Sequence, residues 1–245
     1  LTGLPNRITF KNLLNLAITT ASRYKRNFAV VFIDLDRFKF INDTLGHGAG
    51  DLMLNEITTR LQATLRSSDV IARLGGDEFV AILQEVSDND QATTVGRKLL
   101  SAINKPMMLL NQECSITASM GIAMFPQNGS DEQTLMKNAD SAMYAAKGEG
   151  KNNFQFYSEE INSLSMERLA LEGHLRRALE RNEFSLNYQA KIDLKSNAIT
   201  GVEALLRWKN AELGYKEVKS SALLQETLKK EGFTVEAGVA DIPTA

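Results

Sequence analysis

The feature that most constrains the fold is a glycine pair set between two apolar, β-branched runs. Residues 70–74 form the first run, Gly75 and Gly76 follow, and the second run begins at residue 79. This pattern predicts a β-hairpin whose tip uses positive φ angles. Asp77 and Glu78 come directly after the glycines, and because side chains alternate faces along a strand, both carboxylates cannot lie on one solvent-exposed face. A bare turn followed by two acids suits a phosphate chain that arrives with a divalent cation; the alternative is an ordinary hairpin whose acids face water.

A predicted buried strand supplies a third acid. Residues 28–35 are almost unbroken in their apolar character, which is typical of a strand covered on both faces. The run ends in Asp34-Leu35-Asp36, and ligands commonly bind at the carboxyl ends of central strands in open α/β sheets. Three acids brought to one spot without a cation would repel one another, so Asp34, Asp77 and Glu78 together predict a metal site. We interpret Asp36 as a structural turn residue rather than a ligand.

The remaining segments predict an α+β domain over residues 1–157. Apolar residues at helical spacing indicate helices, and two further apolar runs indicate strands. The predicted segments are a helix with Phe10 and Ala17, a helix with Leu54 and Leu65, a helix over about 88–103, a strand at 115–125, a helix over about 130–146 and a short strand at 154–157. Along the chain, helices and strands alternate around the predicted hairpin. A hairpin inside such an alternating order implies a mixed central β-sheet flanked by helices.

The composition and net charge limit the classes of partner that we expect for the chain. The chain has 43% hydrophobic and 24% charged residues, which is ordinary for a soluble globular protein, and a formal net charge of −2. This charge gives no general attraction to nucleic acid or to an anionic membrane, so we expect neither as a partner, and any anionic ligand needs a local site. Cys114 is the single cysteine, which excludes an internal disulfide and fits a reducing, cytoplasmic compartment.

No apolar run in the sequence approaches the length of a membrane span. The chain opens abruptly at Leu1-Thr2-Gly3, and we interpret it as a piece of a longer protein. A missing N-terminal region could anchor that parent protein to a membrane.

Residues 1–157 resemble a GGDEF domain, the catalytic module of diguanylate cyclases, with its palm-like nucleotide-cyclase fold. Besides the signature Gly75-Gly76-Asp77-Glu78-Phe79, the agreement covers residues 1–7, 34–39, 41–47, 50–51, 119–122 and 139–147. The resemblance implies that two GTP molecules are joined into cyclic di-GMP with release of pyrophosphate. It also implies a homodimer in which each protomer holds one GTP, and Mg²⁺ or Mn²⁺ as the cofactor.

The resemblance assigns the metal site to Asp34, Leu35, Asp77 and Glu78. Glu78 either completes metal binding or takes the proton of the attacking hydroxyl group. The carboxylates supply the oxygen ligands that Mg²⁺ prefers. Together with Glu78, Asp77 is the expected catalytic residue.

The resemblance further assigns the substrate contacts. Asn42 and Asp51 resemble the residues that bind guanine, because an acid can accept from the ring and exocyclic N–H groups. Phe38 and Lys39 resemble the turn whose main-chain N–H groups hold the terminal phosphates. Lys147 resembles the lysine that contacts the phosphates, whereas Lys151 stands where the family usually has an arginine. A lysine keeps the positive charge but cannot form the two parallel hydrogen bonds of an arginine guanidinium to a phosphate. We therefore expect weaker nucleotide binding rather than loss of activity.

Arg66 and Asp69 have the spacing of the family's inhibitory product site, upstream of the signature. An arginine there can pair with a guanine edge or a phosphate, and an aspartate with guanine N–H groups. The alternative is that Arg66 complements a helix C-terminus and Asp69 begins a turn. Agreement in both spacing and residue type favours product inhibition.

The second part of the chain resembles the opening of an EAL domain, the module that hydrolyses cyclic di-GMP. We expect one long helix over 158–181, whose first part, 158–171, links the domains. An incomplete EAL-like segment at 172–210 and an unassigned, possibly foreign tail at 211–245 follow. Two strands are predicted around a turn near residue 196, and a helix and a strand over about 220–239. Glu203 resembles a metal ligand of a whole EAL domain, but one carboxylate cannot hold a catalytic metal pair. We therefore expect no phosphodiesterase activity from this chain.

Two functions remain open from the sequence. The intact signature favours a diguanylate cyclase. The alternative is a catalytically weak domain that binds GTP or cyclic di-GMP and regulates a neighbour in a GGDEF–EAL protein.

Overall fold

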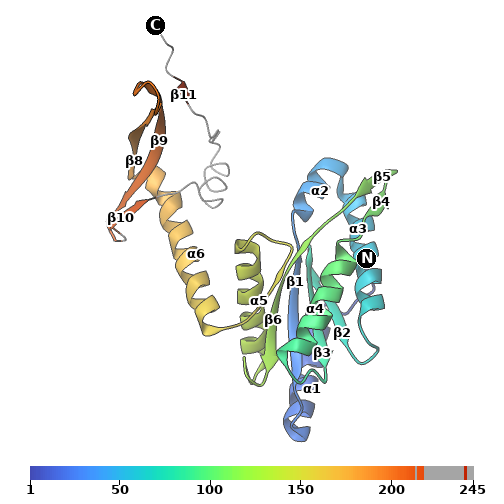
Figure 1. Cartoon of the computed structure of the whole chain (residues 1–245). Coiled ribbons are helices and arrows are strands. Elements are labelled where there is room, and N and C mark those ends of the chain that lie inside the picture. The colour runs from blue at the N-terminus through green and yellow to red at the C-terminus, as the bar shows by residue number, and fades with distance from the viewer. Residues whose placement is uncertain (213, 218–239, 242–245) are drawn as a thin grey trace. The chain divides into compact units, whose positions relative to one another are not determined.

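The computed structural model describes residues 1–212, 214–217 and 240–241 (Figure 1). The chain divides into two compact units, Leu1–Ser165 and Met166–Ala245. Across these described ranges, no helix has both the length and the apolar character needed to cross a bilayer.

A five-stranded mixed sheet forms the centre of the first unit, as the sequence predicted (Figure 1). The strand order is β2-β3-β1-β6-β7; β6 and β7 are parallel, and every other neighbouring pair is antiparallel. The strands are β1 (Phe28–Leu35), β2 (Val70–Gly75), β3 (Glu78–Gln84), β6 (Ala118–Phe125) and β7 (Phe154–Phe156).

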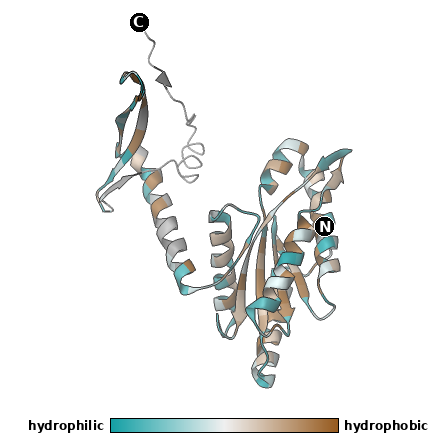
Figure 2. Cartoon of the chain, in the orientation of Figure 1, coloured by the Kyte–Doolittle hydropathy of each residue, from teal (hydrophilic) through white to brown (hydrophobic). Residues whose placement is uncertain are grey.

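Helices cover both faces of this sheet. They are α1 (Arg7–Tyr24), α2 (Phe38–Leu45), α3 (His47–Thr64), α4 (Asn89–Ile103) and α5 (Glu132–Gly148). All eight residues of β1 are buried, because alternate side chains enter two separate cores. Val31 and Ile33 pack in the core that α3 and α4 cover, whereas Val30 and Phe32 pack in the core that α1 and α5 cover. Figure 2 shows the strands of this unit as its most continuously hydrophobic part.

The helix starts follow from local side-chain chemistry. The Asn6 side chain accepts from the Thr9 N–H at 2.9 Å and so caps α1. Asp88 caps α4 in the same way, and Asp131 caps α5 through the Thr134 N–H at 2.9 Å.

A second, short hairpin was not predicted from the sequence. It consists of β4 (Met107–Leu109) and β5 (Gln112–Cys114), joined by Leu110 and Asn111 with φ angles of 48° and 64°. Strands of three residues are too short to show an alternating pattern, and their turn contains no glycine.

Helix α6 (Glu159–Glu180) begins in the first unit and continues into the second, where the antiparallel pair β8 (Phe184–Ile192) and β9 (Ile199–Asn210) follows it. These elements confirm the predicted long helix and two strands. β10 (Gly214–Glu217) and β11 (Ala240–Asp241) also pair with β9. Trp208 is the centre of a small core with Leu175 and Ala178, and its indole N–H donates to Glu183 at 2.9 Å. The helix and strand predicted over 220–239 lie outside the described residues. The domain limits proposed from the sequence stay a prediction.

Candidate active site

The antiparallel pairing of β1 and β3 brings two of the three predicted acids together. Asp34 lies directly opposite Glu78 in the register, and residues opposite each other on neighbouring strands share a face of the sheet. That face is the one covered by α1 and α5. The Leu35 N–H donates to the main-chain oxygen of Asp77 at 3.3 Å, which ties the strand end to the signature turn.

Asp34 pairs with a lysine from α5. The Lys147 ammonium lies 2.8 Å from a carboxylate oxygen of Asp34, whose side chain is only 12% exposed. Burial raises the pKa of the Asp34 carboxyl, and the charges of Asp77 and Asp36 raise it further, whereas the hydrogen bond and charge of Lys147 lower it. Burial therefore outweighs the single lysine, and a nearby cation would stabilise the ionised carboxylate.

Glu78 pairs with Arg7, the first residue of α1, at 3.5 Å. Asp34 and Glu78 thus each have a protein cation beside them. In the part of the chain that the structure describes, no three His, Cys, Asp or Glu side chains are grouped closely enough to hold a metal ion.

The donor set nevertheless fits a hard cation. Asp34, Asp77 and Glu78 offer carboxylate oxygens, and Leu35, whose side chain is buried, can offer only its main-chain oxygen. Because Lys147 and Arg7 already pair with two of these acids, a metal ion would replace the lysine at Asp34 rather than enter a preformed ligand cage.

Asp36 has different partners, consistent with its interpretation as a structural residue. The residue is only 6% exposed, and its side chain accepts from the hydroxyl groups of Thr117 at 2.6 Å and Ser119 at 2.7 Å. It also accepts from the main-chain N–H of Asn152 at 3.2 Å. These three hydrogen bonds leave Asp36 poorly placed to ligate a metal.

The predicted guanine-binding residues lie on α2 and α3. Asn42 on α2 sits over Gly50, since a Cβ atom added to Gly50 would lie 2.0 Å from the Asn42 side-chain oxygen. The same Cβ would lie 3.1 Å from the ring of Phe38. Asp51, the residue after Gly50, is exposed at the start of α3. Gly50 therefore lets the Asn42 amide approach α3 beside Asp51.

The predicted phosphate-binding residues come from two places. Phe38 begins α2, and its buried side chain packs in the core, so only its main-chain N–H is available to a ligand at this helix N-terminus. Lys39 is exposed beside it. Lys147 lies in the last turn of α5, and Lys151 follows the helix with a φ of 66°.

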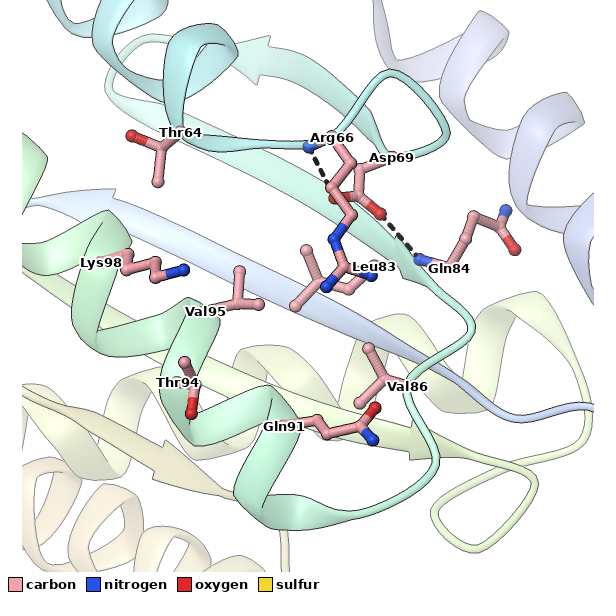
Figure 3. Close-up of a pocket in the computed structure, with 10 residues that line it drawn as sticks. All are labelled: Thr64, Arg66, Asp69, Leu83, Gln84, Val86, Gln91, Thr94, Val95 and Lys98. Atoms are coloured by element: carbon pink, nitrogen blue, oxygen red, sulfur yellow. Dashed lines mark hydrogen bonds between the residues drawn. The ribbon is translucent and has the colours of Figure 1, made fainter.

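Arg66 and Asp69 line a pocket of about 230 Å³ (Figure 3). The two carboxylate oxygens of Asp69 accept from the main-chain N–H groups of Arg66 and Gln84, each at 3.0 Å. The Arg66 side chain extends into the pocket, and Lys98 of α4 lines the opposite side (Figure 3). Both oxygens of Asp69 therefore hold the local backbone. The Arg66 guanidinium is directed into the pocket, which the Lys98 ammonium also lines.

Two arginines near the signature turn were not singled out from the sequence. The Arg73 guanidinium donates twice to the Gly76 main-chain oxygen, at 2.9 and 2.7 Å. The main-chain N–H of Arg73 donates to the main-chain oxygen of Pro5 at 3.1 Å, which docks the N-terminal segment on β2. A charged residue inside an apolar strand, two positions before the glycines, was the available signal for Arg73. Arg7 offered no comparable signal, because its contact with Glu78 depends on the fold.

A mixed sheet with paired acids where a strand end meets a hairpin turn, and with a lysine of the adjoining helix beside one of them, defines an α+β domain of the nucleotide-cyclase type. The chain belongs to the GGDEF family: the sequence model described as "Diguanylate cyclase, GGDEF domain" matches residues 1–153. A second model, described as "EAL domain", matches residues 172–233 and so extends past residue 210.

Among known proteins, the chain is similar to MucR of Pseudomonas aeruginosa, named a bifunctional diguanylate cyclase/cyclic di-GMP phosphodiesterase. The two are 45% identical over 214 residues, which cover 87% of this chain and 31% of MucR. The chain spans about a third or less of the length of the first curated relatives that it matches.

Solved structures agree on the fold. The GGDEF domain of TpbB, also called YfiN, from P. aeruginosa matches with a TM-score of 0.66 and 36% identity over 67% of this chain and 96% of that one. The GGDEF domain of DgcB from Caulobacter crescentus, solved in complex with cyclic di-GMP, matches with a TM-score of 0.58 and 28% identity over 63% of this chain and 92% of that one.

Proposed function

We propose that the chain is a diguanylate cyclase that condenses two GTP molecules into cyclic di-GMP. The observation that carries the proposal is the register that sets Asp34 opposite Glu78 at the signature turn, with Lys147 of α5 beside Asp34. Asp34 is buried and its pKa is raised, so the folded protein disfavours the ionised carboxylate. A bound cation would offset this cost, and such perturbed acids cluster at functional sites. Membership of the GGDEF family supports the same chemistry.

In the proposed reaction, the 3′-hydroxyl oxygen of one GTP attacks the α-phosphorus of the other and pyrophosphate leaves. Repetition of the step in the opposite sense closes the ring, so two GTP give one cyclic di-GMP and two pyrophosphates. A homodimer, with one GTP on each protomer, would bring the two substrates face to face. Glu78 would take the proton from the attacking hydroxyl group or complete the metal site.

The remaining residues would bind and orient GTP. Asn42 and Asp51 would hold guanine, and the N–H groups at Phe38 and Lys39 would hold the terminal phosphates. Lys147 would leave Asp34 and bind a phosphate oxygen. Lys151 would bind the phosphates beside it. Mg²⁺ or Mn²⁺ held by Asp34, Leu35, Asp77 and Glu78 would polarise the α-phosphate and favour the 3′-alkoxide. Because GTP is the substrate, we place this activity in the cytoplasm.

We also propose that cyclic di-GMP binds at the Arg66 pocket and inhibits the cyclase. The directed guanidinium of Arg66 and the nearby Lys98 suit a phosphate or a guanine edge. Asp69 would contribute by holding the turn that presents Arg66, since both of its oxygens already accept main-chain N–H groups.

The test is to incubate the purified chain with GTP and MgCl₂ and to quantify cyclic di-GMP by chromatography and mass spectrometry. We expect product from the wild type and none from Glu78→Gln. Glu113→Gln, an exposed acid on β5, is the matched control and should retain activity. GTP binding without product would support the alternative, a regulatory GTP- or cyclic di-GMP-binding domain. Incubation with cyclic di-GMP should yield no linear dinucleotide, as expected from the partial EAL segment.

A further inference from the structure

The turn that carries Lys151 has an unusual backbone. Lys151 and the next residue, Asn152, have φ angles of 66° and 51°, so two consecutive non-glycine residues adopt the left-handed conformation. Residues with a Cβ atom rarely adopt this backbone conformation, and it persists where the surroundings impose it. The turn therefore needs specific contacts to hold its shape.

The structure shows those contacts. The Asn152 N–H donates to Asp36 at 3.2 Å, and the Asn104 side chain donates to the Asn152 side chain at 2.8 Å. The Asn153 side chain donates to the main-chain oxygens of Lys151 at 3.0 Å and of Ala146 at 2.9 Å. Of these partners, Asp36 is the only acid, and it comes from the end of β1 rather than from the turn.

Asp36 is itself firmly held. The Thr117 and Ser119 hydroxyl groups donate to its two carboxylate oxygens, and its N–H donates to the Thr117 main-chain oxygen at 2.8 Å. The residue is only 6% exposed. A buried carboxylate anchored by two hydroxyl groups is a rigid acceptor, and it lies two residues beyond Asp34.

We propose that Asp36 is a positioning residue for the nucleotide site, which acts by fixing the left-handed turn that presents Lys151. The inference rests on the proposed function and extends it to a residue outside the expected ligand set. The three-residue segment from Asp34 to Asp36 then serves both parts of the site: its first acid faces Glu78, and its last acid sets the turn of a phosphate-binding lysine.

The test is a double-mutant cycle on GTP affinity in the presence of MgCl₂, measured by titration calorimetry. Asp36→Ala and Lys151→Ala should each weaken GTP binding, Lys151→Ala by about tenfold or more, since a charge-assisted contact is lost. The double variant should bind within about twofold of Lys151→Ala, because Asp36 acts through Lys151. Asp36→Asn should restore most of the affinity, since its amide oxygen can accept from Asn152 while its NH₂ group donates to a hydroxyl oxygen.

Asp131→Ala is the matched control. It removes an acid that holds the other end of α5 through Thr134, so it should lower the melting temperature and leave GTP affinity unchanged. Multiplicative losses in the double variant, or unchanged affinity in Asp36→Ala, would overturn the proposal.

Hydrogen exchange at the Asn152 amide separates this inference from the proposed function. Asp36→Ala should accelerate exchange there, whereas Asp131→Ala should not. If the wild type fails to bind GTP, the proposed function is refuted. Unaccelerated exchange in Asp36→Ala would refute the positioning of the turn, whatever the wild type binds.

Discussion

Replacement of Gly121 by alanine tests how closely α5 packs on the sheet. Gly121 lies opposite Phe32 in the pairing of β1 with β6, on the face that α5 covers. A Cβ atom there would lie 1.9 Å from the main-chain oxygen of Ala139 and 2.1 Å from the main-chain nitrogen of Met143. Both atoms belong to the backbone of α5, so no side-chain rotation can relieve the clash.

The expected cost follows from that geometry. Overpacking a core costs about 1–3 kcal/mol where side chains can adjust. Because Gly121→Ala requires the whole helix to move, we expect a loss at or above the upper end, about 3 kcal/mol. For a domain of this size each kcal/mol lowers the melting temperature by about 2–4 °C, so the shift should be roughly 6–12 °C.

Urea and thermal unfolding, followed by circular dichroism, would measure the effect. Gly96→Ala is the matched control: its Cβ would lie 3.5 Å from side-chain atoms of Ile122 and Phe154, an ordinary contact, and alanine favours the helix by up to about 1 kcal/mol. We expect Gly96→Ala to be neutral or stabilising. Substitutions without a clash usually change the free energy of unfolding by less than about 0.5 kcal/mol. If the free energy of unfolding of Gly121→Ala lies within that range of the wild-type value, the close packing of α5 on β6 is refuted.

Three further predictions concern the site. Gly50→Ala should rotate Asn42 away and lower the preference for GTP over ATP in competition binding, with little change in melting temperature, because the clashing atom ends a flexible side chain. Unchanged selectivity would contradict the assigned guanine contact. Arg66→Ala should raise the cyclic di-GMP concentration that gives half inhibition by about tenfold or more in the cyclase assay, since a charge-assisted contact is lost; equal inhibition would exclude Arg66 from the product site. The pKa of the Asp34 carboxyl is raised in the folded protein above its ordinary value of 3.8. Protonated Asp34 therefore stabilises the fold fully below pH 3.8, and this stabilisation is lost as the pH rises through the raised pKa. Since a cation requires the ionised form, Mg²⁺ affinity measured by calorimetry should fall as the pH is lowered through that value, and a flat profile would argue against Asp34 as a ligand.

The fold was largely predictable because its signals are local. The unbroken apolar run of β1, the Gly75-Gly76 pair and the helical spacing of apolar residues each describe a contiguous segment, and each matches an element of the structure. The β4–β5 hairpin lacked such a signal, since its strands have three residues each.

The contacts within the site were less predictable. The ion pair of Asp34 with Lys147 and the hydrogen bond of Asp36 with Asn152 join residues more than 100 positions apart. No periodicity connects such residues; they meet because β1 and β6 are neighbours and α5 follows β6. The residue types at the site were therefore predictable, whereas their pairing in the absence of a ligand depended on the tertiary structure.

Successive side chains of β1 lie in two different cores, so a shift of its register by one residue cannot be accommodated. Deletion of one residue between Phe28 and Ile33 would turn every remaining side chain of that part of the strand toward the opposite core, or else shift the end of the strand and set Leu35 instead of Asp34 opposite Glu78. By contrast, an added residue between Leu110 and Asn111 would lengthen only an exposed turn. Length variation among functional members of this family should therefore be tolerated in that turn and absent from β1.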